Sequence, residues 1–220
     1  MDATHFSLDS GHGDVSAAWS TPRQPRATLV VAPGAGFGYD APFLVSFTRG
    51  MNDGGVATLR FNFPYREQGK KAPNPERVLR ATWLAAFGEA VSRSASGARV
   101  LAGGKSLGGR IASLVVADGM PAAGLVFLGY PLHPPGDPTS VRDEHLYRIG
   151  VPMLFLQGTR DPFAQTDRLA PVLSRLGGRA SLVPFEGGDH SFHVSGGVHD
   201  DEAVGASLAP PTVAFIEGLI

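Results

Sequence analysis

The sequence predicts an α/β protein with a mostly parallel sheet, helices on both faces and an N-terminal antiparallel hairpin. From Thr28 onward, short apolar runs alternate with longer stretches of helical period. That alternation is typical of parallel strands joined by helices that cover both faces of the sheet. The 220 residues, of which 43% are hydrophobic, suffice for one sizeable core. We therefore expect residues 1–220 to form a single domain without a separate lid.

Apolar runs bounded by turn-forming residues mark the expected strands. The first two are joined by a glycine-rich turn, which is typical of a hairpin. The expected strands span residues 5–8, 15–19, 28–32, 56–61, 99–102, 124–128, 152–157 and 180–185.

Apolar residues at helical spacing mark five helices between these strands. The expected apolar stripes cover residues 44–51, 79–91, 111–115, 169–176 and 208–219. The second helix should begin at Pro75, with Asn74 as its N-cap. The long Pro- and Gly-rich segment 129–148 can hold a short helix around residues 142–146.

Composition excludes several classes of function. The formal net charge is −1 and no long basic run is present, so a nucleic-acid partner is not expected. Cysteine is absent, which removes disulfides and thiolate metal sites and fits a reducing compartment. The N-terminus lacks the pattern of a signal peptide, and no apolar run approaches the ~20 residues that span a bilayer. We expect a cytoplasmic protein that needs neither metal nor organic cofactor.

The segment Gly104-Lys105-Ser106-Leu107-Gly108 matches the pattern G-x-S-x-G. The pentapeptide alone is a weak signal in a glycine-rich chain, but here it follows an expected strand and precedes an expected helix. A serine on such a sharp strand-to-helix turn needs small neighbours, because side chains two residues away would collide. Ser106 is therefore the candidate nucleophile, raised at the N-terminus of a helix where developing negative charge is favoured.

A serine hydroxyl needs a base near neutral pH, and His190 is the best candidate among seven histidines. It lies in a glycine-rich loop after the last expected strand, whereas His193 is a nearby but less favourable alternative. His133 lies in the long loop, where it could contact substrate. The remaining histidines are expected at the surface: His5, His12, His145 and His199.

Asp161 is the candidate acid that orients the base, because it lies just past the expected strand 152–157. Less well placed alternatives are Asp137, Asp143 and Asp189. The chain order Ser106, Asp161, His190 is the order of the triad in α/β-hydrolases, so the sequence predicts the α/β-hydrolase fold. Activity that depends on a neutral histidine should rise through roughly pH 6–8.

An oxyanion hole requires backbone N–H groups close to the serine. One should come from Leu107 and the other from the glycine-rich loop after strand 28–32, where Ala35 is favoured over Gly36. Candidate substrate-binding residues at the same edge of the sheet are Gly36, Phe37, Tyr65 and Phe192. Arg110, in the first turn after the serine, is expected to pack against the sheet edge.

Two nucleotide-binding motifs are excluded by single positions. The segment Gly104-Lys105-Ser106 resembles the end of a P-loop, but that motif requires glycine where Arg99 stands. The loop Gly34-Ala35-Gly36 resembles a dinucleotide fingerprint, but that motif requires a third glycine where Tyr39 stands.

Five segments together resemble a group of small α/β-hydrolases similar to the testis-expressed-protein-30 and NSL-complex-subunit-3 domains, distantly related to dienelactone hydrolases. The resemblance covers roughly residues 27–219 and is carried by Pro33-Gly34-Ala35-Gly36, Arg60-Phe61-Asn62-Phe63-Pro64-Tyr65, Gly104-Lys105-Ser106-Leu107-Gly108-Gly109-Arg110, Gln157-Gly158-Thr159-Arg160-Asp161-Pro162-Phe163 and Gly188-Asp189-His190-Ser191-Phe192. It implies a lidless hydrolase fold with the same triad. Ser106 stands where dienelactone hydrolases carry cysteine.

The expected activity is acyl transfer from a small-molecule ester or related acyl substrate to water, through an acyl-enzyme on Ser106. Two alternatives remain open: a non-catalytic interaction module that keeps the hydrolase fold, and a small peptidase. An intact serine, acid and base favour the enzyme, since a scaffold has no need to retain all three. A peptidase is less favoured because no second domain is expected that could select peptide ends.

Overall fold

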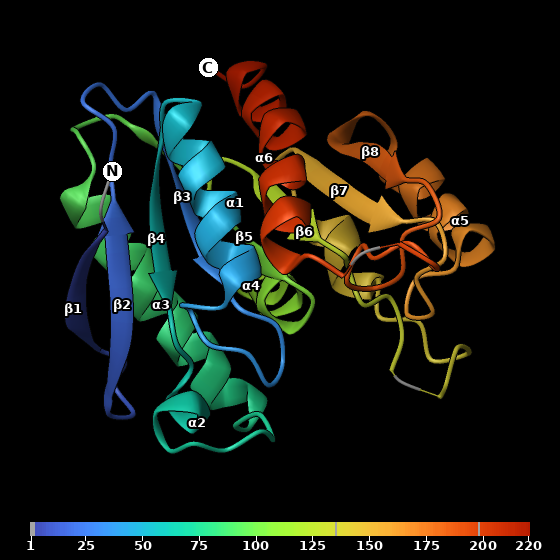
Figure 1. Cartoon of the computed structure of the whole chain (residues 1–220), viewed down its shortest axis with the longest axis horizontal. Helices are drawn as coiled ribbons and strands as arrows, with labels where there is room; N and C mark the ends of the chain where they lie inside the picture. The colour runs from blue at the N-terminus through green and yellow to red at the C-terminus, as the bar shows by residue number, and fades with distance from the viewer. Residues whose placement is uncertain (1–2, 135, 198) are drawn as a thin grey trace.

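The computed structural model describes residues 3–134, 136–197 and 199–220, and an eight-stranded sheet forms its centre (Figure 1). The spatial order of the strands is β1-β2-β4-β3-β5-β6-β7-β8. They are β1 (Thr4–Asp9), β2 (Asp14–Ser20), β3 (Ala27–Ala32), β4 (Val56–Phe61), β5 (Arg99–Lys105), β6 (Leu125–Leu128), β7 (Met153–Gly158) and β8 (Ala180–Phe185). β2 pairs antiparallel with both β1 and β4, and the other neighbouring pairs are parallel. The predicted sheet and its N-terminal hairpin are confirmed.

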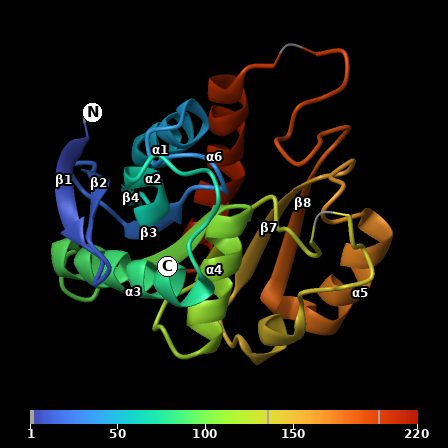
Figure 2. The same ribbon diagram turned by 90° about the horizontal axis from the view of Figure 1, so that it is seen from below.

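Helices cover both faces of the sheet, with α1 and α6 on one side and α3, α4 and α5 on the other (Figure 2). The helices are α1 (Pro42–Asp53), α2 (Pro64–Glu67), α3 (Glu76–Arg93), α4 (Leu107–Ala117), α5 (Thr166–Leu176) and α6 (Asp201–Glu217), with 3₁₀ turns η1 (Glu144–Arg148) and η2 (Gly177–Arg179). Along β3, Leu29 and Val31 pack in the core under α1 and α6, whereas Val30 packs in the opposite core with Trp83 of α3. The period-two alternation of a strand thus supplies two cores. Among the described residues, none of the helices is long and apolar enough to cross a membrane.

The order of the strands creates the place for a site. From β3 the chain moves outward through α1 to β4, and then returns through α3 to β5 on the other side of β3. The loops that follow β3 and β5 therefore leave the carboxyl edge of the sheet in different directions. Ligands of open α/β sheets bind in the crevice at such a switch point.

The helices α1 and α6 are neighbours, as both views show (Figures 1 and 2). A Cβ atom on Gly205 of α6 would lie 2.2 Å from the carbonyl oxygen of Phe43, so the two backbones can approach this closely only at a glycine. Helix α6 begins at Asp201, several residues before the predicted stripe. The residues in the first turns of α6 are mostly small or polar. The Asp200 side chain caps the helix by accepting the Ala203 N–H at 2.9 Å.

Several local predictions were wrong. Helix α3 begins at Glu76 with Pro75 as its N-cap residue, and the Asn74 side chain accepts the N–H of Tyr65 at 2.7 Å instead of capping the helix. Strand β5 runs to Lys105, beyond the predicted end at residue 102, because its glycines continue to pair with β6. The four residues of α2 are too few to show a helical period in the sequence. The short helix expected around residues 142–146 is the 3₁₀ helix η1, which lies at Glu144–Arg148.

Candidate active site

The serine of the G-x-S-x-G segment lies between β5 and α4 in strained backbone. Ser106 has φ 49° and ψ −115°, values that non-glycine residues rarely adopt. A Cβ atom on Gly104 or Gly108 would lie 2.5 or 2.4 Å from the carbonyl oxygen of Ala32, so only glycine lets β3 approach the turn this closely. The tight turn places the hydroxyl of Ser106 at the N-terminus of α4.

The loop after β8 holds His190 in position, and Asp189 organises that loop. The Asp189 Oδ1 atom accepts the backbone N–H groups of Ser191 at 2.7 Å and His193 at 3.0 Å. The loop also joins the neighbouring loop after β7, since the Arg160 N–H donates to the Gly188 carbonyl at 2.9 Å. These contacts bring the imidazole to the carboxyl edge of β5 and β7.

Ser106, His190 and Asp161 are brought together at this edge from three separate loops. The His190 Nε2 atom lies 2.7 Å from Ser106 Oγ, and His190 Nδ1 lies 2.6 Å from Asp161 Oδ2. An ionised carboxylate only accepts hydrogen bonds, so the proton of the neutral imidazole belongs on Nδ1. Nε2 is then free to accept the hydroxyl proton of Ser106.

The carboxylate of Asp161 is fully buried and held by two further donors. The Gln157 side-chain amide donates to Oδ2, and the Phe163 N–H donates to Oδ1 at 2.8 Å. Gln157 is itself fixed, because its Oε1 atom accepts the Tyr130 N–H at 2.8 Å. The sequence prediction missed Gln157, although a polar residue at the end of an otherwise apolar strand was a usable signal.

The other candidate acids and bases have different contacts. His193 Nε2 lies 3.0 Å from Asp201 Oδ1, and the Asp189 carboxylate accepts backbone N–H groups of its own loop. His145 is buried beside Ser113, so its predicted surface position was wrong. Within the described part of the chain, no group of three or more His, Cys, Asp or Glu side chains is placed to hold a metal ion.

Lys105, directly before the serine, adds a partly buried cation next to the histidine. Its Nζ atom donates to the carbonyl oxygen of His190 at 2.6 Å, and burial lowers the pKa of this lysine to about 8. Burial also lowers the pKa of His190. The hydrogen bond that its ring donates to Asp161 opposes this shift, and the charge of Lys105 adds to it. The imidazole is therefore neutral near pH 7, the state in which it can accept a proton.

The candidate oxyanion-hole N–H groups belong to the loop after β3 and to the first residue of α4. The loop after β3 passes close by, since a Cβ on Gly34 would lie 3.7 Å from the Cβ of Ser106. The Gly36 N–H donates to the hydroxyl oxygen of Tyr65 at 3.2 Å and so already has a partner. Among the described residues, the N–H groups of Ala35 and Leu107 donate to no protein acceptor.

A cavity of about 420 Å³ opens in front of the serine and the histidine, and most of its wall is apolar. Of the four residues expected to bind substrate, only Phe37 lines it. Tyr65 is fully buried behind the loop, Gly36 is not part of the wall, and Phe192 packs between Phe43 and Phe185. Residues of the wall that the sequence prediction missed are Pro73, Pro131, Arg142, Phe163 and Ser191.

Two polar side chains of the cavity wall come from the long segment 129–148 and from the start of α4. His133 lines the wall, the position in which it was expected to contact substrate. Arg110 also lines the wall, so the expectation that it only packs against the sheet edge was wrong. It lies in the first turn of α4, four residues after Ser106, and both residues line the same cavity.

Known structures share this fold over nearly their whole length. An alpha-beta serine hydrolase homologue from Coxiella burnetii is 18% identical, with a TM-score of 0.76 and 98% of each chain covered. Dienelactone hydrolase from Anabaena variabilis is 16% identical, with a TM-score of 0.77, covering 99% of this chain and 97% of its own. Est1E from Butyrivibrio proteoclasticus is 15% identical, with a TM-score of 0.71, covering 97% of this chain and 99% of its own.

The sequence also matches a family model, which names the family more directly than these distant structures. The model, described as an alpha/beta hydrolase domain, matches residues 25–215. The narrower resemblance to the testis-expressed-protein-30 and NSL-complex-subunit-3 group stays a prediction. The match runs from just before β3 into α6 and includes all three residues at the carboxyl edge of the sheet. The chain belongs to the alpha/beta hydrolase domain family.

Proposed function

We propose that the protein is a serine hydrolase that cleaves ester bonds of small molecules through an acyl-enzyme on Ser106. The observation that carries the proposal is the continuous hydrogen-bonded chain from Asp161 through His190 to Ser106, with contacts of 2.6 and 2.7 Å. This is the arrangement in which a base removes the proton of an attacking hydroxyl while a carboxylate orients the base.

The reaction follows from the groups at hand. Ser106 Oγ attacks the carbonyl carbon of the ester as its proton passes to His190 Nε2. The oxyanion of the tetrahedral intermediate then accepts hydrogen bonds from the N–H groups of Ala35 and Leu107. His190 then protonates the departing alcohol as the carbon–oxygen bond breaks. A water molecule then attacks the acyl-enzyme through the same steps, which releases the acid and restores the hydroxyl of Ser106. Asp161 stabilises the imidazolium that forms in each half of the reaction.

The cavity favours a small acyl substrate. Its volume of about 420 Å³ lies in the range of small-molecule sites, and Phe37 and Phe163 supply apolar wall for an acyl chain. The neighbouring N–H group of Gly36 is taken by Tyr65, which favours Ala35 as the donor from this loop.

Labelling with a fluorophosphonate probe tests the proposal, because the probe forms a covalent bond only with an activated serine. We expect labelling of the wild-type protein and turnover of short-chain 4-nitrophenyl esters, both lost in Ser106→Ala. The loss of turnover should be about 10⁴-fold or more. A wild-type protein that is folded but neither labelled nor active would favour a non-catalytic interaction module, and faster cleavage of aminoacyl amides than of esters would favour a peptidase.

A further inference from the structure

Two arginines line the candidate active-site cavity without a carboxylate beside them in its wall. Arg110 of α4 and Arg142 of the segment before η1 both contribute to the wall, which contains no Asp or Glu among the described residues. Arg142 makes no side-chain hydrogen bond or ion pair with any described residue. A cavity wall that holds guanidinium groups but no carboxylate is suited to a ligand with a negative charge.

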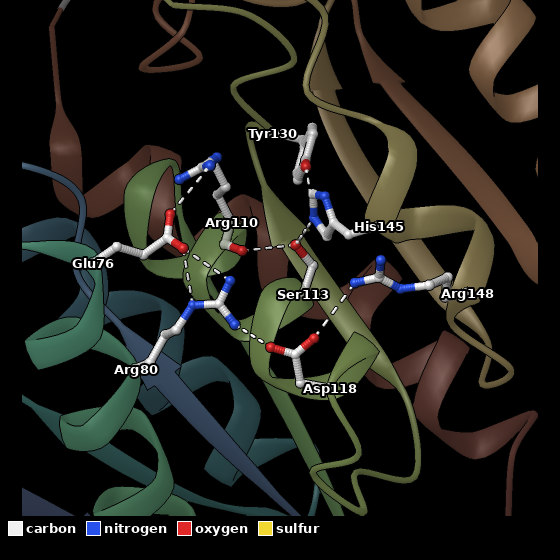
Figure 3. Close-up of polar contacts among 8 residues, drawn as sticks. All are labelled: Glu76, Arg80, Arg110, Ser113, Asp118, Tyr130, His145 and Arg148. Carbon is white, nitrogen blue, oxygen red and sulfur yellow. Dashed lines mark hydrogen bonds and ion pairs between the residues drawn. The ribbon is translucent and has the colours of Figure 1, made fainter.

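Among the described residues, the one acidic contact to these arginines is long. An oxygen of Glu76 lies 3.5 Å from a terminal nitrogen of Arg110, whereas the same side chain binds Arg80 at 2.8 Å (Figure 3). The Nε atom of Arg110 is buried and has no partner among the described residues. Most of the donor capacity of Arg110 is therefore unused within the protein.

A third unpaired donor or acceptor lies in the same wall. His133 is 3% exposed, and its Nε2 atom has no hydrogen-bond partner among the described residues. Its Nδ1 atom lies 3.0 Å from the carbonyl oxygen of Pro134, which fixes the ring. A carbonyl oxygen only accepts hydrogen bonds, so the proton of the neutral ring lies on Nδ1, and Nε2 is left as a buried acceptor that a hydroxyl or N–H group of a ligand would satisfy.

A buried network holds the backbone of both arginines in place, and Figure 3 shows the part of it around Arg110. The Ser113 hydroxyl donates to the carbonyl oxygen of Arg110 at 2.7 Å, and the Tyr130 hydroxyl donates to that of Arg142 at 3.0 Å. His145 Nε2 joins the two hydroxyls, at 2.7 Å from Ser113 and 3.3 Å from Tyr130. The two guanidinium groups are thus carried by anchored backbone, which favours binding because less order must be created.

The charges also act on each other. Burial lowers the pKa of Arg142, and the nearby positive charge of Arg110 lowers it further. Two like charges that face one cavity repel each other until an anion lies between them.

We propose that the substrate carries a carboxylate a few bonds from the scissile ester, and that Arg110 and Arg142 bind this group with His133 beside it. The inference names the substrate class of the proposed hydrolase and rests on that function. Arg110 lies one turn after Ser106 on α4, so the bound carboxylate and the attacked carbonyl occupy the same small cavity. The reaction would release a free dicarboxylate and an alcohol.

Two measurements on the full chain test the inference. The first is calorimetric binding of adipate, compared with its neutral diamide. We expect adipate to bind more tightly than the diamide, and Arg110→Gln and Arg142→Gln each to weaken adipate binding by about tenfold or more. Arg148→Gln is the matched control, because it removes the same charge from an exposed arginine that pairs with Asp118 outside the cavity (Figure 3). This control should bind adipate as the wild type does.

The second measurement compares kcat/KM for 4-nitrophenyl hydrogen adipate and 4-nitrophenyl hexanoate. We expect the ratio of anionic to neutral ester to fall about tenfold or more in each arginine variant, and to stay constant in Arg148→Gln. Adipate binding no tighter than that of the diamide, or arginine variants that keep the wild-type affinity and ratio, would overturn the inference even with ester hydrolysis intact. Arginine-dependent adipate binding in a protein that cleaves no ester would support the anion site and refute the hydrolase.

Discussion

At the scale of single residues, the proposed hydrolysis depends on the charge of one imidazole and on the groups that surround it. His190 lies between the buried carboxylate of Asp161 and the hydroxyl of Ser106, with the ammonium of Lys105 on its carbonyl oxygen. Burial and the lysine both favour the neutral ring, whereas Asp161 favours the charged one. The balance of these effects decides the pH range in which the base can work.

The acidic limb of the pH profile should lie below the ordinary histidine range. Because the pKa of His190 is lowered, the neutral base persists to lower pH than an exposed histidine would allow. We expect kcat/KM to rise with pH through an apparent pKa below about 6.5 and to be level by pH 7. This revises the limb of roughly pH 6–8 expected from sequence. A midpoint at pH 7 or above would contradict the lowered pKa.

Replacing Lys105 by Met should move that limb upward. The substitution removes a positive charge that disfavours the imidazolium, so the apparent pKa in the kcat/KM profile should rise relative to the wild type. A purely structural role would reduce turnover at every pH and leave the midpoint in place. Lys70→Met, a change of the same type at an exposed lysine, is the control and should leave the profile unchanged.

Replacing Asp161 by Asn should reduce kcat by about 10⁴-fold, because an amide no longer fixes the tautomer that leaves Nε2 free. Steady-state kinetics on a 4-nitrophenyl ester measures the loss. Asp137→Asn provides the comparison, since Asp137 was an alternative acid and is exposed, with its carboxylate on Thr139. Equal loss in both variants would exclude Asp161 as the orienting acid.

At the scale of elements, close contacts between backbones fix how helices sit on the sheet. Helix α6 crosses α1 where Gly205 faces the carbonyl oxygen of Phe43. Strand β3 approaches the serine turn where Gly104 and Gly108 face the carbonyl oxygen of Ala32. Helix α1 is the main helical neighbour of α6. A side chain at the crossing would separate the pair and open the core beneath it.

Gly205→Ala should destabilise the protein although alanine is the better helix former. The added Cβ would lie 2.2 Å from the Phe43 carbonyl oxygen, and overpacking of this kind costs about 1–3 kcal/mol or more. Gly88→Ala is the matched control in α3, where the new Cβ meets no atom within 4 Å. It should stabilise by about 0.5–1 kcal/mol. Urea unfolding measures both, and equal effects of the same sign would refute the close crossing.

At the scale of the whole molecule, a buried neutral histidine ties α4 to the segment around η1. The hydroxyls of Ser113 and Tyr130 give their protons to backbone carbonyls, so His145 Nε2 must be the donor to both oxygens (Figure 3). Burial and the neighbouring arginines lower the pKa of His145 to about 4. The unfolded chain, with an ordinary histidine, therefore binds the extra proton first as pH falls.

This histidine should make the fold sensitive to acid. Between the unfolded pKa of about 6.5 and the folded value of about 4, its contribution to the free energy of unfolding falls by roughly 3 kcal/mol. Denaturant unfolding at pH 4–7 should show a weaker fall in His145→Gln than in the wild type. His12→Gln, at an exposed histidine, should follow the wild type. Parallel curves for all three proteins would mean that His145 does not titrate in this range.

The sequence by itself determined the layers, the strand order along the chain and the three residues of the candidate triad. Apolar runs and helical stripes are local patterns, and residues after parallel strands meet at one edge of the sheet whatever the details of packing. Ser106, Asp161 and His190 could be chosen for that reason. Helix α6 was recognised only in its second half, because its first turns are small and polar and carry no apolar period.

Only the tertiary structure decided which side chains face the cavity. Tyr65 and Phe192 follow the right strands, yet one is buried behind a loop and the other packs into the core. Arg142 lacked a local signal, because its place in the cavity wall depends on residues distant in the chain. Side-chain direction is set by packing across elements, which a one-dimensional pattern does not contain.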